Sequence, residues 1–258
     1  MAGSLAETPR GPVLQFELAE ISLIGAREEN QDRIASAVDG QTALVAVFDG
    51  MGGHADGARA AELARQTVLS RFNATPHPVL DPLAFMHMAL GAAHTDMVTL
   101  GAQLPLEHRP RATGAACLLQ DGIAWSVHVG DSRIYHLRDG AVLSRTRDHS
   151  HVELLVQEGL ISAQQAQTHP MRNFVESCLG GDAMLPEMHV GRQVGVRSGD
   201  IMLVCSDGFW ANLLDEDVAA SMYSGVQLQV ALQAVSEFAV RRAGPGADNA
   251  TAVALRVL

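Results

Sequence analysis

Three Asp-Gly pairs, each lying between two extended apolar segments, constrain the fold of this chain more than any other feature. They are Asp39-Gly40, Asp121-Gly122 and Asp139-Gly140. Asp-Gly suits a two-residue hairpin turn because both turn positions require positive φ. The pairs therefore predict antiparallel hairpins, with strands over about residues 34–38, 42–48, 112–119, 123–129, 132–137 and 142–144.

Helical periodicity and further apolar runs complete the expected order of elements. Helices are expected over 57–72, 82–100, 149–159 and about 228–239. Further strands are expected over 16–24, 188–194, 201–205 and 250–257. Because strand groups alternate with helix groups, the order favours an α+β fold with segregated layers. We expect a flexible tail over 1–14 and one domain over 15–258, with an irregular segment at about 157–188.

The composition excludes several classes of protein. A formal net charge of −11 argues against nucleic acid or an anionic membrane as the main partner, since both attract positive surfaces. The chain has no apolar run long enough to span a bilayer and no signal segment, so we expect a soluble cytoplasmic protein. All eighteen basic residues are arginine, which excludes a Schiff-base or P-loop lysine mechanism.

Three aspartates at strand boundaries are candidate metal ligands. Asp49 and Asp207 each follow an apolar strand, and Asp248 precedes the last one. Each alone is more often a turn or capping residue. If the three converge, their mutual repulsion calls for a divalent cation, and oxygen ligands favour Mg²⁺ or Mn²⁺. Two such ions would lower the pKa of a water and aim it at phosphorus.

Three further residues are candidates for the same site. A phosphate dianion is best bound by an arginine, and Arg27, in the charged loop ahead of Asp32, is the candidate, although most arginines are solvated surface residues. His54 follows two glycines and is equally well interpreted as a site residue or as a helix-entry residue. Asn249 either orients a ligand carboxylate or makes a turn hydrogen bond.

Seven short segments, in order, resemble the motif set of metal-dependent protein phosphatases of the protein phosphatase 2C type. One such motif is a weak signal, but seven in the right order over residues 20–258 are specific. The segments are Arg27-x-x-Asn30-x-Asp32, Asp49-Gly50-Met51-Gly52-Gly53-His54, Thr113-Gly114, Gly130-Asp131-Ser132-Arg133-x-Tyr135, Asp148-His149-Ser150, Ser206-Asp207-Gly208 and Asp248-Asn249-x-Thr251.

The resemblance implies a fold and a metal centre. The fold would be two antiparallel sheets stacked face to face and flanked by helix pairs, with two metal ions at one end. By similarity, Asp49 would bridge both ions and Gly50 would bind one through its carbonyl. Asp207 and Asp248 would complete the other.

The resemblance also implies roles around that centre. Arg27 would bind the substrate phosphate, and Asp32 would support the second metal through water. Asp131 would match the ligand of a weaker third metal. The segment at about 157–188 would be a flap beside the active site. The Met-Gly-Gly-His form is similar to compact bacterial members, which oppose eukaryotic-type Ser/Thr kinases.

Three positions depart from the family pattern. Gln31 stands where many members have glutamate, so a direct ligand to the second metal is lost. Met51 stands where animal members have a histidine proposed as general acid, which leaves that proton to water or another donor. Ala211 replaces an aspartate that helps hold the third metal, which weakens the case for Asp131.

The sequence thus predicts a monomeric Mn²⁺- or Mg²⁺-dependent phosphatase of phosphoserine and phosphothreonine in proteins, acting by direct attack of a water activated by two metals, with a weaker third ion. Its substrates would be those of a eukaryotic-type Ser/Thr kinase. The alternative is a catalytically weak or inactive module that keeps the fold and binds phosphoproteins. A two-metal nuclease is disfavoured by the acidic charge.

Overall fold

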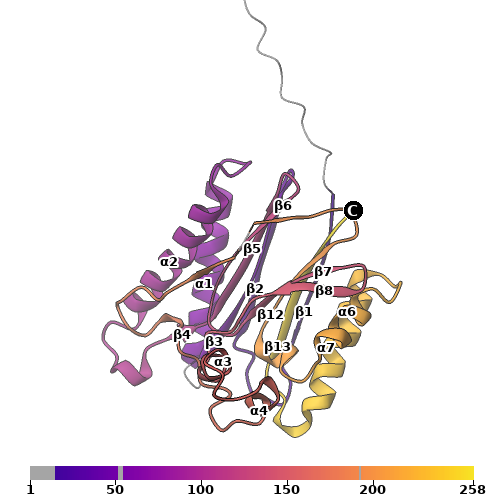
Figure 1. Ribbon diagram of the computed structural model, residues 1–258. Coiled ribbons are helices and arrows are strands. Elements are labelled where there is room, and N and C mark those ends of the chain that lie inside the picture. Colours follow the sequence, from indigo (N-terminus) through magenta and orange to yellow (C-terminus); the bar gives the residue numbers. More distant parts are fainter. Residues whose placement is uncertain (1–14, 52–54, 192) are drawn as a thin grey trace, which may run out of the picture.

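The chain folds into two antiparallel β-sheets that lie face to face between two layers of helices, in a computed structural model that describes residues 15–51, 55–191 and 193–258 (Figure 1). The strands are β1 (Phe16–Leu23), β2 (Asp32–Asp39), β3 (Thr42–Met51), β4 (Arg111–Ala112), β5 (Gly114–Gln120), β6 (Ile123–Val129), β7 (Arg133–Arg138), β8 (Ala141–Arg145), β9 (Leu179–Gly180), β10 (His189–Val190), β11 (Val194–Gly195), β12 (Ile201–Cys205) and β13 (Ala250–Val257). The helices are α1 (Ala55–Ala74), α2 (Pro82–Leu100), η1 (Leu106–His108), α3 (His151–Gln157), α4 (Ala163–Gln167), α5 (Asp207–Trp210), α6 (Asp215–Met222), α7 (Leu228–Ala243) and η2 (Gly244–Gly246).

The order of strands places distant parts of the chain side by side. One sheet has the order β1-β13-β12-β7-β8. The other has the order β10-β6-β5-β3-β4-β9, with β2 paired to β3 and β11 paired to β6. The first and last strands are therefore neighbours, and β12 and β13 lie together in register. This pairing brings the end of β12 next to the start of β13.

The second and third Asp-Gly pairs form the predicted hairpin turns, whereas in the first hairpin Asp39 still pairs with Thr42 and the turn residues are Gly40 and Gln41. All three turns lie where the sequence predicts a hairpin. They connect β2 to β3, β5 to β6 and β7 to β8. In the second and third turns both residues have positive φ, as at Asp121 (53°) and Gly122 (75°). In the first turn Gly40 has a φ of 59°, while Asp39 does not adopt positive φ. The residues at the turns therefore determine where the antiparallel hairpins form.

Strand β3 shows why its sequence is apolar without interruption. Leu44 and Phe48 face the cluster made with α1 and α2, whereas Val45 and Val47 face the other sheet. A strand buried on both faces has no polar alternation. On the far side, α6 and α7 cover the other sheet, with Val218 and Leu232 in that core. The predicted arrangement of two stacked sheets between helix layers is confirmed.

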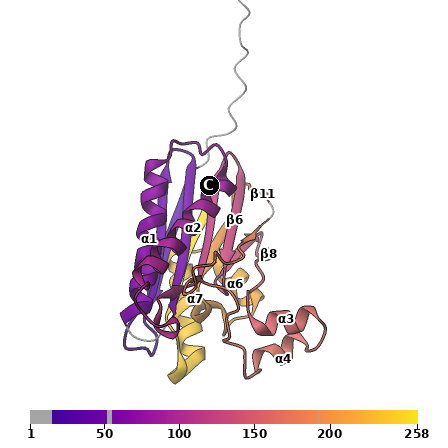
Figure 2. The ribbon, with the colours of Figure 1, turned by 90° about the vertical axis from the view of Figure 1, so that its left-hand side faces the viewer.

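Short elements differ from the sequence-based expectation. Helix α6 was not expected, and its buried Val218, Ala219 and Met222 occupy a helix too short to show a clear period. The irregular segment contains α4, which a capping box at Ser162 stabilises, and the strand expected over 188–194 is divided into β10 and β11. In Figure 2, α3 and α4 project beside the body of the molecule.

Parts of the expectation fall outside the described structure. The tail over 1–14 and His54 lie outside the described residues. Within those that are described, no helix combines the length and the apolar character that crossing a membrane requires.

Candidate active site

Five aspartates from separate segments gather at one end of the sandwich. Asp32 begins β2 and lies opposite Asp49 in the β2–β3 register. Asp131 lies between β6 and β7, Asp207 begins α5 one residue after the end of β12, and Asp248 precedes β13. Asp32, Asp131, Asp207 and Asp248 each raise the pKa of at least one other member by charge repulsion, and Asp49 shares a hydrogen bond with Asp207. The sheet topology therefore brings together all the aspartates that the sequence singled out.

The ionised forms of the gathered carboxyl groups are destabilised by burial and by mutual repulsion. Burial raises the pKa of Asp49 well above its usual range, and repulsion from Asp32 and Asp207 raises it further. Burial and repulsion from Asp248 raise the pKa of Asp207 to about 6, although a hydrogen bond with Asp49 opposes this shift. Burial raises the pKa of Asp32 to about 7. A divalent cation would relieve this repulsion, so the donor set fits Mg²⁺ or Mn²⁺.

One of the three expected ligands is held by another partner. Asp248 accepts a hydrogen bond from Arg27 Nη2 at 2.6 Å and another from the Asn249 backbone N–H at 2.8 Å. Over residues 15–51, 55–191 and 193–258, no three His, Cys, Asp or Glu side chains already form a group that could hold a metal ion. If an ion bound to Asp49 and Asp207, it would compete with Arg27 for the Asp248 carboxylate, or the carboxylate would contact both.

The loop that carries Arg27 is fastened by Asn249. The Asn249 side-chain amide donates to Ile24 O at 2.8 Å and to Glu29 O at 3.0 Å, and its Oδ1 accepts from Gln31 N at 2.8 Å. These three bonds tie both ends of the loop to the start of β13. Of the two alternatives left open by the sequence, the Asn249 side chain makes the loop hydrogen bonds, while its backbone N–H contacts the Asp248 carboxylate. Arg27 is held beside Asp248.

Hydroxyl groups that sequence reasoning did not assign support the acids. Ser206 Oγ donates to Asp32 Oδ2 at 2.7 Å and accepts from Thr251 N at 3.0 Å. Thr113 Oγ1 accepts from Asp49 N at 3.3 Å, and Thr113 N donates to Asp49 O at 2.8 Å. Ser206 therefore orients the carboxylate of Asp32, whereas Thr113 holds the backbone of Asp49. Both residues stand within the recognised motifs, but only the fold shows these contacts.

Two glycines allow chain segments at the site to approach each other closely. A Cβ on Gly50 would lie 2.1 Å from Gly57 O at the start of α1, and Gly50 N donates to Gln31 O at 3.2 Å. Position 50 therefore requires glycine for packing, whether or not its carbonyl binds an ion. A Cβ on Gly208 would lie 2.1 Å from Asn249 O. This contact sets the approach of Asp207 to Asp248.

We expect Gly208→Ala to destabilise the protein by at least about 2 kcal/mol, because the added methyl group meets rigid backbone. Thermal unfolding followed by circular dichroism measures the change. Gly195→Ala is the matched control, since nothing lies within 4 Å of its added Cβ. Equal unfolding temperatures for Gly208→Ala and the wild type would contradict the close approach of the two segments.

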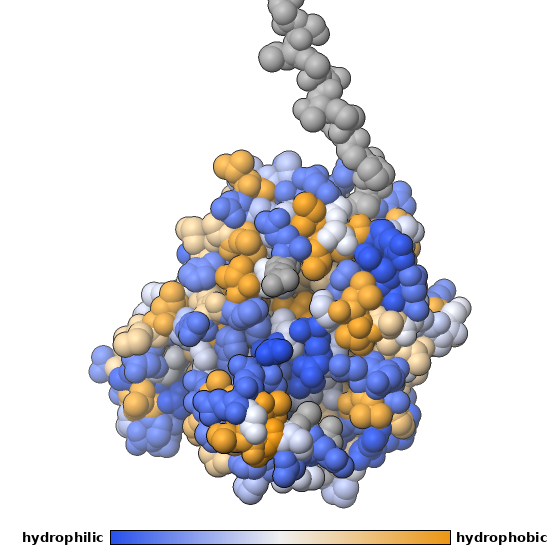
Figure 3. Space-filling model, in the orientation of Figure 1, coloured by the Kyte–Doolittle hydropathy of each residue, from blue (hydrophilic) through white to orange (hydrophobic). Residues whose placement is uncertain are grey.

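An open cleft of about 880 Å³ extends from the acid cluster. Residues 207–216 form one wall, and α3 with part of segment 166–173 forms the other. Arg27, Asp207, Asp248 and the buried Asp131 line the cleft. Figure 3 shows hydrophilic side chains over much of this face and apolar ones gathered over α3. The cleft has room for more than a phosphate group.

The fold and the site define a class, that of two-sheet sandwiches with an acidic cleft at one end. Within this class, the chain belongs to the protein phosphatase 2C family, whose sequence model matches residues 22–238. The family membership predicted from the seven motifs is confirmed.

Characterised relatives agree with this assignment. The chain is 32% identical over 240 residues to the serine/threonine protein phosphatase PstP of Mycobacterium tuberculosis, covering 90% of this chain and 43% of PstP. It thus spans less than half the length of that relative. The S. agalactiae serine/threonine phosphatase structure matches with a TM-score of 0.86 and 28% identity, covering 95% of this chain and 100% of that one. The catalytic domain of PstP, solved in complex with two manganese ions, has a TM-score of 0.80 and 28% identity, with 95% and 99% covered.

Proposed function

We propose that the chain is a Mn²⁺- or Mg²⁺-dependent phosphatase that hydrolyses phosphoserine and phosphothreonine in proteins. The observation that carries the proposal is the gathering of Asp49, Asp207 and Asp248 beside Arg27 at a cleft. Oxygen ligands for hard cations and a planar cation for a phosphate dianion then lie in one place. The relative solved with two manganese ions supports the choice of metal.

The aspartates divide into ligands and supports. Asp49 would bridge two ions, Gly50 would add its carbonyl to one, and Asp207 and Asp248 would complete the other. Asp32, oriented by a hydrogen bond from Ser206, would support an ion through water. When bound, the two ions supply charge neutralisation and an activated water for direct attack at phosphorus.

Arg27 would bind the phosphate group of the substrate. Its side chain is 59% exposed, and Asp248 already holds its guanidinium at the acid cluster. A planar fork can bind two phosphate oxygens at once, which fixes the orientation of the ester. The hydrogen bonds of Asn249 hold the loop in place, so the arginine is positioned before substrate arrives.

The departures from the family pattern tune the proposed site. Gln31 Nε2 donates to Glu29 at 3.5 Å, and its neutral amide adds no negative charge for a second ion. Met51 has a thioether that cannot donate a proton to a leaving group. Asp131 has its pKa raised well above the usual range by burial and by Asp207, so it is a candidate for a third ion even with Ala211 in place of an aspartate.

The cellular role follows from the same proposal. The substrates would be phosphoproteins made by a eukaryotic-type Ser/Thr kinase in the cytoplasm, and the chain would act as a monomer. The relatives named above are bacterial Ser/Thr phosphatases, which supports this setting.

The test is release of inorganic phosphate from a phosphothreonine peptide and from p-nitrophenyl phosphate. We expect turnover with Mn²⁺ or Mg²⁺ and none with EDTA, because the proposed reaction depends on a water activated by the metal ions. Folding is checked by circular dichroism. Folded protein that binds the phosphopeptide without any metal-dependent turnover would instead be a phosphoprotein-binding module, and cleavage of plasmid DNA would indicate a nuclease.

A further inference from the structure

We propose that Arg133 is a positioning residue that fixes the spacing between the two walls of the active-site cleft and thereby favours phosphate esters carried on peptides over small ones. This inference rests on the phosphatase activity proposed above and deepens it. Arg133 belongs to one of the recognised motifs, but no role follows from the motif itself.

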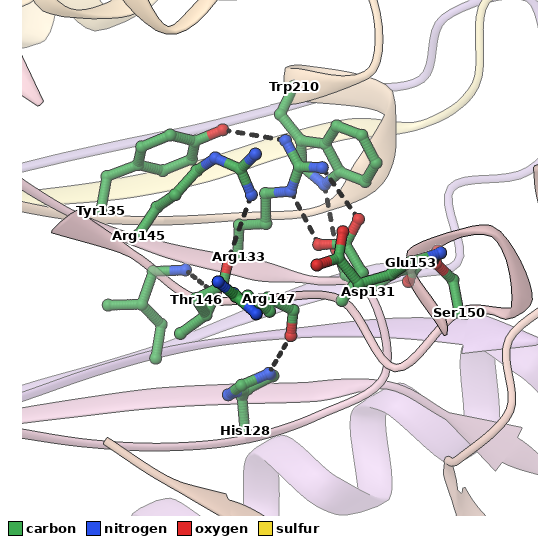
Figure 4. Close-up of polar contacts among 12 residues, drawn as sticks. His128, Asp131, Arg133, Tyr135, Arg145, Thr146, Arg147, Ser150, Glu153 and Trp210 are labelled. Atoms are coloured by element: carbon green, nitrogen blue, oxygen red, sulfur yellow. Dashed lines mark hydrogen bonds and ion pairs between the residues drawn. The ribbon is translucent and has the colours of Figure 1, made fainter. Parts of the chain in front are cut away.

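The contacts of Arg133 use the whole guanidinium group. Its Nε and Nη2 donate to Oδ1 and Oδ2 of Asp148, both at 2.8 Å, and its Nη1 donates to Tyr135 Oη at 3.3 Å. The guanidinium carbon lies 3.2 Å from the centroid of the Trp210 ring (Figure 4). Only 12% of the Arg133 side chain and 7% of the Asp148 side chain are exposed. A bidentate pair stacked on an aromatic ring requires arginine, because lysine has neither the fork nor the plane.

The two partners belong to opposite walls. Asp148 leads into Ser150, whose side chain caps α3, and α3 forms one wall of the cleft. Trp210 ends α5, the helix that begins with Asp207, and this helix forms part of the other wall. Arg133 also lines the cleft, at the start of β7. One buried guanidinium therefore joins both walls to the sheet between them.

The same group of contacts reaches the acid cluster. Trp210 Nε1 donates to Asp131 O at 3.0 Å, which ties the ring to the segment that precedes Arg133. A second ion pair, Arg145 with Asp215 at 3.1 Å, lies further out, with 32% and 41% of the side chains exposed. Exposed pairs contribute little, so the buried pair at Arg133 carries the connection.

We call the contacts of Arg133 with Asp148 and Trp210 the clamp. The size of the cleft explains how the clamp affects substrate choice. A phosphate group needs only the end formed by Arg27, Asp207 and Asp248, whereas the rest of the 880 Å³ is free for residues that flank a phosphorylated side chain. A change in wall spacing alters contacts with the flanking peptide and leaves a small aryl phosphate nearly unaffected. The difference is measurable as a change in KM for one substrate class.

The test compares Arg133→Lys with Arg138→Lys. Arg138 is the matched control because it lies on the same strand and forms a bidentate pair with the buried Asp200, at 2.7 and 2.6 Å, but does not line the cleft. We expect Arg133→Lys to raise KM for a phosphothreonine peptide about tenfold with kcat little changed, and to change kcat/KM for p-nitrophenyl phosphate less than about twofold. Arg138→Lys should leave the ratio of the two activities unchanged.

Hydrogen–deuterium exchange tests the clamp independently of catalysis. We expect Arg133→Lys to speed exchange in both walls, at residues 148–157 and 207–216, and Arg138→Lys to leave them unchanged. If the wild type turned over neither substrate, the proposed function would fail, yet unchanged exchange in the walls would still overturn the clamp. An equal loss of activity on both substrates, or no loss, would overturn the role in specificity. If Arg133→Lys does not fold, Asp148→Asn should show the same pattern with a smaller rise in KM.

Discussion

Replacing Asp49 or Asp207 with alanine is expected to lower turnover at least about a thousandfold while the chain stays folded, because either change removes a carboxylate that holds the ions and their charge stabilisation. Both aspartates end apolar strands in the sequence, and neighbouring aspartates of the cluster raise the pKa of each by charge repulsion. The loss should appear in kcat with saturating Mn²⁺, since a missing ligand weakens the transition state as well as metal binding.

The stability of these variants gives a second measurement. In the metal-free protein, burial and repulsion raise the pKa of Asp49, so its ionised form opposes folding at neutral pH. Asp49→Ala should therefore unfold at the same temperature as the wild type or at a higher one without metal. Adding Mn²⁺ should raise the unfolding temperature of the wild type and not that of the variant.

Asp39→Ala is the matched control for both variants. Asp39 also precedes a glycine, but it is exposed and lies beside a hairpin turn, at the end of β2 opposite to Asp32 and the acid cluster. It should keep wild-type turnover. Retention of a tenth of the wild-type rate by Asp49→Ala or Asp207→Ala would place the active site elsewhere.

The hairpin turns of this structure can be predicted from the sequence. A tight turn depends on two residues, so Asp121-Gly122 and Asp139-Gly140 predict their hairpins without help from the rest of the chain. Asp207 differs, because its position depends on the pairing of β12 with β13 and on the contact between Gly208 and Asn249. The spacing of residues along the chain predicts neither the strand pairing nor this contact. Only the resemblance to a family indicated that the aspartates meet.

Contacts between distant segments were beyond the reach of sequence patterns. The pair of Arg133 with Asp148 and the stacking on Trp210 join residues that no periodicity connects. Helix α5 begins at Asp207 itself, which therefore serves both as a candidate ligand and as the first residue of a helix. Turn and capping roles are common for aspartate, so a local pattern cannot separate the two uses. The electrostatic surroundings of the residue separate them.

Replacing Arg27 with alanine is expected to lower kcat/KM by about a hundredfold through a higher KM, because a bidentate charge-assisted contact to the phosphate is lost. Both p-nitrophenyl phosphate and a phosphopeptide should be affected, since both carry the phosphate that Arg27 binds. This pattern differs from the one expected for Arg133→Lys, which separates the two substrates. Steady-state kinetics on both substrates distinguish a phosphate-binding arginine from one that positions the walls.

The ion pair of Arg27 with Asp248 adds a consequence for metal binding. Because Asp248 is also an expected ligand, removal of Arg27 frees its carboxylate, and the Mn²⁺ concentration for half-maximal activity should fall or stay the same. Arg197→Ala is the matched control, since Arg197 is equally exposed, at 59%, and pairs with Asp139 in a hairpin turn. It should change neither KM nor the metal requirement. A higher Mn²⁺ requirement for Arg27→Ala with unchanged KM would mean that Arg27 orders Asp248 for the metal rather than binding phosphate.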